Sequence, residues 1–132
     1  MGFFQRLKEF WSGPKYCINR EVLLEYGKNI MQFSVEHDLC ACDEFFLSAD
    51  GKAWERISII NYDATCEDPL DAEKGLTGFR IYVTNGSFYD PEKSKYFYTL
   101  ESFIDFHLGS YPQQFYLRHE LGSPVELEKY KI

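Results

Sequence analysis

Apolar side chains recur at helical spacing in three segments of the chain. In residues 20–36 they are three or four positions apart, and Asn19 just before them is a good N-cap. Residues 3–11 show the same spacing, with polar residues between the apolar ones. A third such segment follows Thr99, another good N-cap, and has Gly109 just past its end. The spacing therefore predicts two to three helices.

Gly27 lies in the middle of the helix predicted for residues 20–36. Glycine costs about 1 kcal/mol relative to alanine inside a helix. Its presence therefore indicates either close packing against a neighbouring element or an early end of the helix. The sequence leaves both interpretations open.

From residue 45 onward the apolar pattern becomes typical of β-strands. Asp50-Gly51 predicts a hairpin turn, and the strand after it carries mixed residue types on both faces, as a central strand does. The predicted strands are Phe45–Leu47, Trp54–Tyr62, Phe79–Thr84, Lys95–Tyr98 and a short one at Phe115–His119, followed after Gly122 by a charged tail that we expect to be irregular at its end. We therefore expect one α+β domain, residues 1–132, in which a mostly antiparallel sheet of four to five strands packs against two to three helices, N-terminal helices first.

The composition indicates a protein that folds by itself. Apolar residues make up 45% and aromatic residues 18% of the 132 positions, enough to offset the entropy of ordering the chain. We find no run of about 18 apolar residues and no export signal. Four cysteines are ordinary for a reduced compartment, and a chain of this size does not need disulfide bonds to fold. We expect a cytoplasmic protein.

The charge balance bears on the choice of partner. The formal net charge is −7, with 21 acidic and 14 basic residues. Binding to a phosphate backbone draws most of its affinity from clustered Lys and Arg, so we expect no direct contact with nucleic acid. An acidic surface instead steers basic partners toward the protein.

Two neighbouring features predict a partner-binding surface. The first is a long acidic loop after the second predicted strand, and the second is a group of aromatic residues around the Asn85-Gly86 turn, of which about half must face away from the core. Exposed aromatic residues beside acidic ones are typical of protein interfaces, although cross-strand packing within the core explains them equally well. The predicted partner-binding residues are Asp63, Glu67, Asp68, Asp71, Glu73, Tyr82, Phe88 and Tyr89. The wider aromatic group also includes Tyr96, Phe97 and Tyr98.

The rest of the sequence gives only weak indications of a metal site or a catalytic site. His37, Cys40 and Cys42 are zinc-ligand types, and Cys66 could add a fourth, but Cys-x-Cys spacing does not wrap an ion as structural zinc sites do. The acidic loop lacks the spacing of an EF-hand. No nucleophile elbow or cysteine-protease motif is present. We therefore assign no metal, no cofactor and no catalytic residue, and we expect His107 and His119 to be packed or surface residues.

The stretch Lys95–Ile104, KYFYTLESFI, resembles the strand-then-capped-helix segment common in small immunity proteins of bacterial polymorphic and contact-dependent growth inhibition toxin systems. Small size, acidity and the lack of a catalytic motif are also similar to that group. The resemblance covers about ten of 132 residues and carries over no functional residue. It implies a cytoplasmic, non-enzymatic protein that neutralises a cognate toxin by tight binding, commonly by occluding the toxin's active site.

Two other functions remain as alternatives. A small enzyme or ligand-binding domain would use an aromatic-lined pocket, with His107, Tyr98 and Cys66 as candidate lining residues. A membrane-peripheral protein would use the amphipathic segment Phe3–Trp11, although we expect that segment to pack on the protein's own core. The leading hypothesis is an inhibitor of a basic toxin domain, with no membrane contact and with self-association left open.

Overall fold

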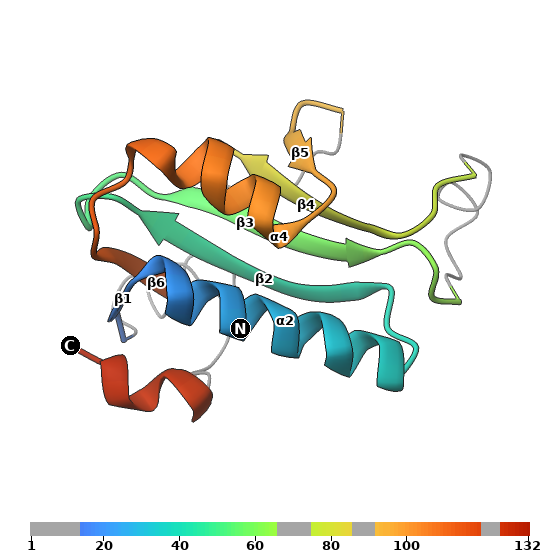
Figure 1. Cartoon of the computed structure of the whole chain (residues 1–132), viewed down its shortest axis with the longest axis horizontal. Helices are drawn as coiled ribbons and strands as arrows, with labels where there is room; N and C mark the ends of the chain where they lie inside the picture. The colour runs from blue at the N-terminus through green and yellow to red at the C-terminus, as the bar shows by residue number, and fades with distance from the viewer. Residues whose placement is uncertain (1–13, 66–74, 86–91, 120–124) are drawn as a thin grey trace, which may run out of the picture.

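The computed structural model describes residues 14–65, 75–85, 92–119 and 125–132, which form an α+β fold around one antiparallel sheet (Figure 1). The six strands of the sheet lie in the order β1-β6-β2-β3-β4-β5. They are β1 (Tyr16–Ile18), β2 (Ala41–Ser48), β3 (Glu55–Asn61), β4 (Phe79–Thr84), β5 (Lys95–Phe97) and β6 (Phe115–His119). The predicted class is confirmed, whereas the predicted number of four to five strands is too low.

The extra strand and the end of the chain correct two further predictions. Strand β1 precedes helix α2 (Arg20–Glu36), so helices do not come first in the described part of the chain, and the predicted helix at 3–11 lies outside it. The sequence predicts a tail that is irregular at its end, whereas Val125–Tyr130 forms the 3₁₀-helix η3 and Lys131 then bridges to Tyr16. Strand β1 depends on pairing with β6 and Lys131, which are far away in the sequence and which local periodicity does not report.

The hairpin between β2 and β3 is confirmed, and its side chains explain the turn. Asp50 Oδ1 accepts hydrogen bonds from the backbone N–H groups of Lys52 (2.8 Å) and Ala53 (3.0 Å). Gly51 has φ +81°, a conformation that glycine adopts at low cost, and its N–H donates to Ser48 Oγ. Hydrogen bonds from the backbone N–H groups of Ala53 and Lys52 and from the Ser48 hydroxyl lower the pKa of the Asp50 carboxyl to about 2.

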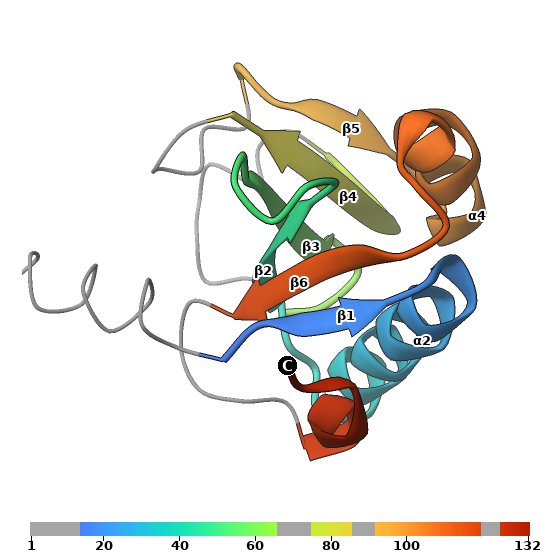
Figure 2. The same cartoon turned by 90° about the vertical axis from the view of Figure 1, so that its left-hand side faces the viewer.

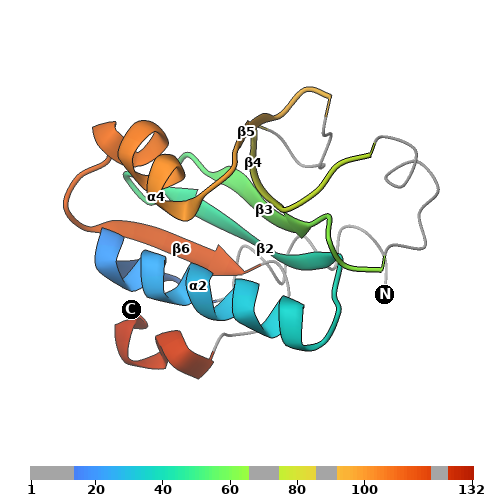
Figure 3. The same cartoon turned by 45° about the vertical axis from the view of Figure 1, so that its right-hand side comes forward.

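Helix α2 has the predicted bounds and runs along the sheet against β2 and β3 (Figure 3). Its N-cap is Asn19, whose Oδ1 accepts from Val22 N at 2.9 Å. A Cβ placed at Gly27 would lie 2.8 Å from Leu100 Cδ2, at the first residue of helix α4 (Leu100–Ser102). Gly27 therefore marks close packing between two helices and does not end α2.

Helix α4 begins where the sequence predicts it to begin. Thr99 Oγ1 accepts from Ser102 N at 3.0 Å, as an N-cap does. The chain then widens into the π-helix η1 (Phe103–His107) and tightens into the 3₁₀-helix η2 (Leu108–Ser110). Gly109 lies inside η2, so it is not the residue just past the end that we expected.

The core lies between one face of the sheet and the two helical segments, α2 and α4 with η1 (Figure 2). Alternate strand residues point into this layer, as the pleat of a sheet requires. No described helix covers the opposite face, which we call the outer face. The residues buried most completely on the core side are Tyr16, Ile18, Leu23, Phe45, Leu47, Ile57, Ile59, Ile81, Phe103, Leu108, Phe115 and Leu117.

Candidate functional site

The outer face of the sheet carries aromatic and arginine side chains toward the β4–β5 edge. Register places Tyr82 of β4 opposite Tyr96 of β5, and Arg80 of β4 opposite Ile60 of β3. Because side chains alternate between faces, these residues lie on the face opposite the core residue Ile81. This edge of the outer face is the candidate site.

Arg80 is surrounded by tyrosine rings. Its guanidinium carbon lies 5.2 Å from the ring centroid of Tyr62, 5.5 Å from that of Tyr96 and 5.1 Å from that of Tyr98. These distances are within the range of cation–π attraction. Tyr62 and Tyr82 join the group through a 2.7 Å hydrogen bond between their hydroxyls. We call these five residues the tyrosine cluster.

Two rings of the tyrosine cluster form its solvent-facing surface. Tyr96 is 46% exposed and Tyr98 is 60% exposed, and their rings meet edge to face with centroids 5.5 Å apart. Tyr82 is only 4% exposed, and its ring centroid lies 5.8 Å from that of Tyr96. Tyr82 therefore supports the exposed rings and offers little surface itself.

The hydroxyls of Tyr96 and Tyr98 differ in acidity. A hydrogen bond with Tyr96 lowers the pKa of Tyr98, and a hydrogen bond with Arg80 lowers it further. The same interaction raises the pKa of Tyr96. The tyrosine cluster therefore places two hydroxyls of unequal acidity beside its exposed rings.

The structure describes two of the predicted partner-binding residues, Tyr82 and Asp63. Asp63 Oδ1 accepts from Gly78 N at 2.9 Å, and Asp63 N donates to Asn61 Oδ1 at 3.1 Å, so this carboxylate holds the two ends of the acidic loop together. The remaining predicted residues, Glu67, Asp68, Asp71, Glu73, Phe88 and Tyr89, lie outside the described part of the chain.

Sequence reasoning missed the roles of Tyr62 and Arg80. Alternation along β4 was the available signal, since Arg80 and Tyr82 are two positions apart and must share a face. The contact with Tyr62, which follows β3 directly, depends on the pairing of β3 with β4.

A second polar cluster joins β3 to the segment after η2. Glu55 Oε1 lies 2.9 Å from His107 Nε2 and accepts from Tyr111 Oη at 2.7 Å. The hydrogen bond with His107 lowers the pKa of Glu55, although partial burial opposes this shift. Burial and the bond to Glu55 raise the pKa of Tyr111. His107 also stacks on Phe103, with centroids 5.5 Å apart, so this cluster fastens the helical segment to the sheet.

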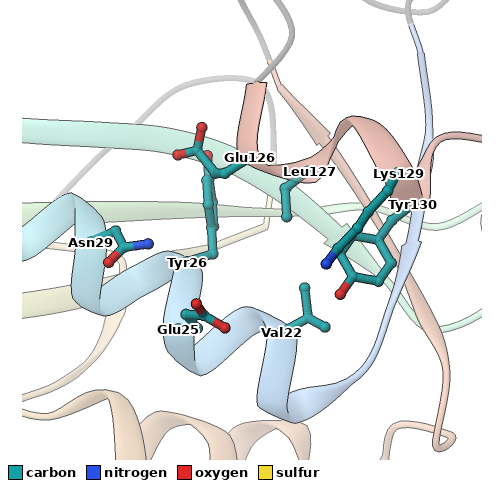
Figure 4. A pocket seen from close by; sticks show the side chains of 8 residues that line it. All are labelled: Val22, Glu25, Tyr26, Asn29, Glu126, Leu127, Lys129 and Tyr130. Atoms are coloured by element: carbon teal, nitrogen blue, oxygen red, sulfur yellow. The ribbon is translucent and has the colours of Figure 1, made fainter.

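The pocket proposed for an enzyme is not assembled in the described part of the chain. His107 contacts Glu55 on the core side, Tyr98 contacts Arg80 on the outer face, and Cys66 lies outside the described residues. A cavity of about 80 Å³ lies instead between α2 and η3 (Figure 4). It is far smaller than the pockets that enclose small-molecule ligands. Its lining residues are Val22, Glu25, Tyr26, Asn29, Glu126, Leu127, Lys129 and Tyr130.

The described residues of the possible metal-binding group, His37 and Cys40, make other interactions. Cys40 is disulfide-bonded, which differs from the expectation of reduced thiols, whereas Cys17 is a free thiol. The ring of His37 packs against that of Phe33, with centroids 4.1 Å apart. Among the described residues, no group of three or more His, Cys, Asp and Glu side chains is placed to hold a metal ion.

Comparison with known proteins gives no relative from which a function could be transferred. No family model, curated protein or solved structure matches the chain. Within the described ranges, no helix combines the length and the apolar character needed to cross a membrane. The functional inference therefore depends on the residues of the candidate site.

Proposed function

We propose that the chain is a non-enzymatic inhibitor of the immunity-protein kind, which binds a partner protein through the tyrosine cluster. The observation that carries this proposal is the exposure of Tyr96 and Tyr98 around the guanidinium of Arg80. Tyrosine and arginine are enriched among the residues that contribute most to protein–protein binding.

The rings are also held in place before binding. The ring of Tyr96 packs against the buried ring of Tyr82 and the exposed ring of Tyr98. These contacts restrict its rotamers, so less side-chain entropy is lost when a partner binds. Immobilising mobile side chains at an interface costs about 0.5–1.5 kcal/mol each, so pre-ordered anchors strengthen binding. This arrangement favours a binding surface over a catalytic one.

The net charge of −7 supports a basic partner, such as a toxin domain. In this proposal the acidic stretch from Asp63 to Glu73 attracts the partner over distance, and the tyrosine cluster makes the close contact. The proposed compartment is the cytoplasm. Because disulfides are rare in the cytosol, the bond at Cys40 makes the redox state of this residue a direct test of that location.

The test is a growth-rescue assay in the native host's background. The tagged chain captures its partner from lysate, and the partner is then expressed alone and together with the chain. We expect the partner alone to stop growth, the wild-type chain to restore it, and the Tyr96→Ala/Tyr98→Ala double variant to fail. Phe33→Ala, which removes another exposed aromatic ring on α2, is the matched control and should rescue. Rescue by the double variant would refute the assignment of the binding surface.

A further inference from the structure

The two edge strands of the sheet, β1 and β5, differ in whether other described residues pair with their outer sides. The β1 edge is covered by the end of the chain, where Ile132 N donates to Lys15 O at 2.9 Å and Lys131 bridges to Tyr16. Strand β5 pairs with β4 on one side, and no described residue pairs with its other side. Strand β5 is three residues long, so one or two of its residues direct their backbone N–H and C=O groups to the open edge of the sheet.

The side chains around β5 define what could pair with it. Tyr96 places an exposed ring on the outer face, next to Tyr98. Lys95 and Phe97 point to the other face, where Lys95 Nζ lies 5.4 Å from the Phe97 ring centroid. An added strand would therefore meet an aromatic surface on one face and a positive charge on the other.

A second copy of this chain is a poor occupant of the edge. Each copy carries a formal charge of −7, so two copies repel one another. Lysine on an edge strand is also a common device against pairing between identical sheets. A segment with a carboxylate opposite Lys95 would turn that charge into an attraction.

We propose that β5 accepts an extended segment of the partner protein as an additional strand of the sheet. The segment carries an apolar or aromatic residue beside Tyr96 and, at a neighbouring position, an acidic residue facing Lys95. Backbone hydrogen bonds give such strand addition its affinity, and the alternating side chains give it specificity. This inference rests on the proposed function, because it specifies how the tyrosine cluster meets the partner. The local requirement for a carboxylate is compatible with a partner that is basic as a whole.

The test uses short linear peptides displayed on phage and selected against the immobilised full chain. We expect the selected peptides to alternate apolar and acidic residues. A synthetic peptide of the consensus sequence should slow hydrogen exchange of outward-facing backbone amides in Lys95–Phe97. Lys95→Glu should weaken its binding about tenfold or more at low salt. Lys129→Glu makes the same charge change on η3, which packs beside β1 at the opposite edge, and should leave binding unchanged.

Three results would overturn strand addition. The selection could enrich no peptide, the exchange of the β5 amides could stay unchanged in the bound state, or both lysine variants could bind equally well. A partner protein that needs Tyr96 and Tyr98 but leaves the β5 amides unprotected would refute strand addition and leave the proposed function standing. If the wild-type chain does not restore growth in the presence of the partner, the proposed function itself is refuted.

Discussion

The guanidinium carbon of Arg80 lies 5.1 Å from the ring centroid of Tyr98 on the outer face of the sheet. A hydrogen bond with Tyr96 lowers the pKa of the Tyr98 hydroxyl, and the hydrogen bond with this guanidinium lowers it further. Arg80→Gln removes a charge that stabilises the phenolate, so the pKa of Tyr98 should rise. Titration of the tyrosine ring carbons by NMR measures it. Lys129→Gln removes one positive charge elsewhere and should leave Tyr98 unaffected; an unchanged Tyr98 in Arg80→Gln would contradict the described contact.

Glu55 should make stability depend on pH. Its pKa in the folded protein is lower than the usual 4.5, chiefly because of the hydrogen bond with His107. The ionised carboxylate therefore stabilises the fold above the usual pKa, and this contribution disappears as pH falls through the lowered value. Glu55→Gln should reduce the free energy of unfolding by about 1 kcal/mol at neutral pH, and the difference from wild type should shrink in acid.

Urea unfolding at a series of pH values measures this difference. Glu25→Gln, at an exposed position of α2, is the control and should follow the wild type throughout. A difference between Glu55→Gln and wild type that stayed constant into acid would show that the carboxylate charge is not responsible.

The contact between Gly27 and Leu100 should limit the size of the side chain at position 27. A β-branched side chain there would push against Leu100, because even a single Cβ would lie 2.8 Å from Cδ2. We expect Gly27→Val to lower the free energy of unfolding by about 1–3 kcal/mol, as overpacking does. Lys28→Val, at a mostly exposed neighbouring position, also removes the ion pair with Glu101 and should cost only about 0.5–1 kcal/mol through that pair and helix propensity. Equal losses in the two variants, measured by chemical denaturation, would contradict close packing here.

Cys40 and Cys17 should differ in their reaction with an alkylating agent. In denaturant without reductant, Cys17 should be alkylated and Cys40 should not, because Cys17 is a free thiol and Cys40 is disulfide-bonded. Addition of a reductant should make Cys40 reactive, as mass spectrometry of tryptic peptides would show. Alkylation of Cys40 before reduction would contradict the disulfide and would agree with a reducing compartment.

The elements that sequence predicted best are those whose signals are local. Helix α2 combines a 3.6-residue period with an N-cap at Asn19, and both act within a few residues of the chain. The turn at Asp50-Gly51 is likewise held by hydrogen bonds among its own residues. In contrast, β1 exists because Tyr16 pairs with Leu117 and Lys131, which local patterns cannot predict.

The candidate site could be predicted only in part for the same reason. Alternation indicates that about half of the aromatic residues near β4 and β5 face away from the core. Which half does so depends on the side of the sheet that α2 and α4 cover, and this follows from tertiary packing. The position of Arg80 among three rings also requires that Tyr62, just after β3, lies beside Tyr96 and Tyr98, in and just after β5.

The central claim is that Tyr96 and Tyr98 form the partner-binding surface. Isothermal titration of the purified captured partner against wild type, Tyr96→Ala and Phe33→Ala tests it most directly. We predict that Tyr96→Ala raises the dissociation constant by tenfold or more, corresponding to a loss of about 1.4 kcal/mol or more, whereas Phe33→Ala binds as wild type does. Unchanged binding by Tyr96→Ala together with a loss in Phe33→Ala would contradict the claim and place the surface on α2.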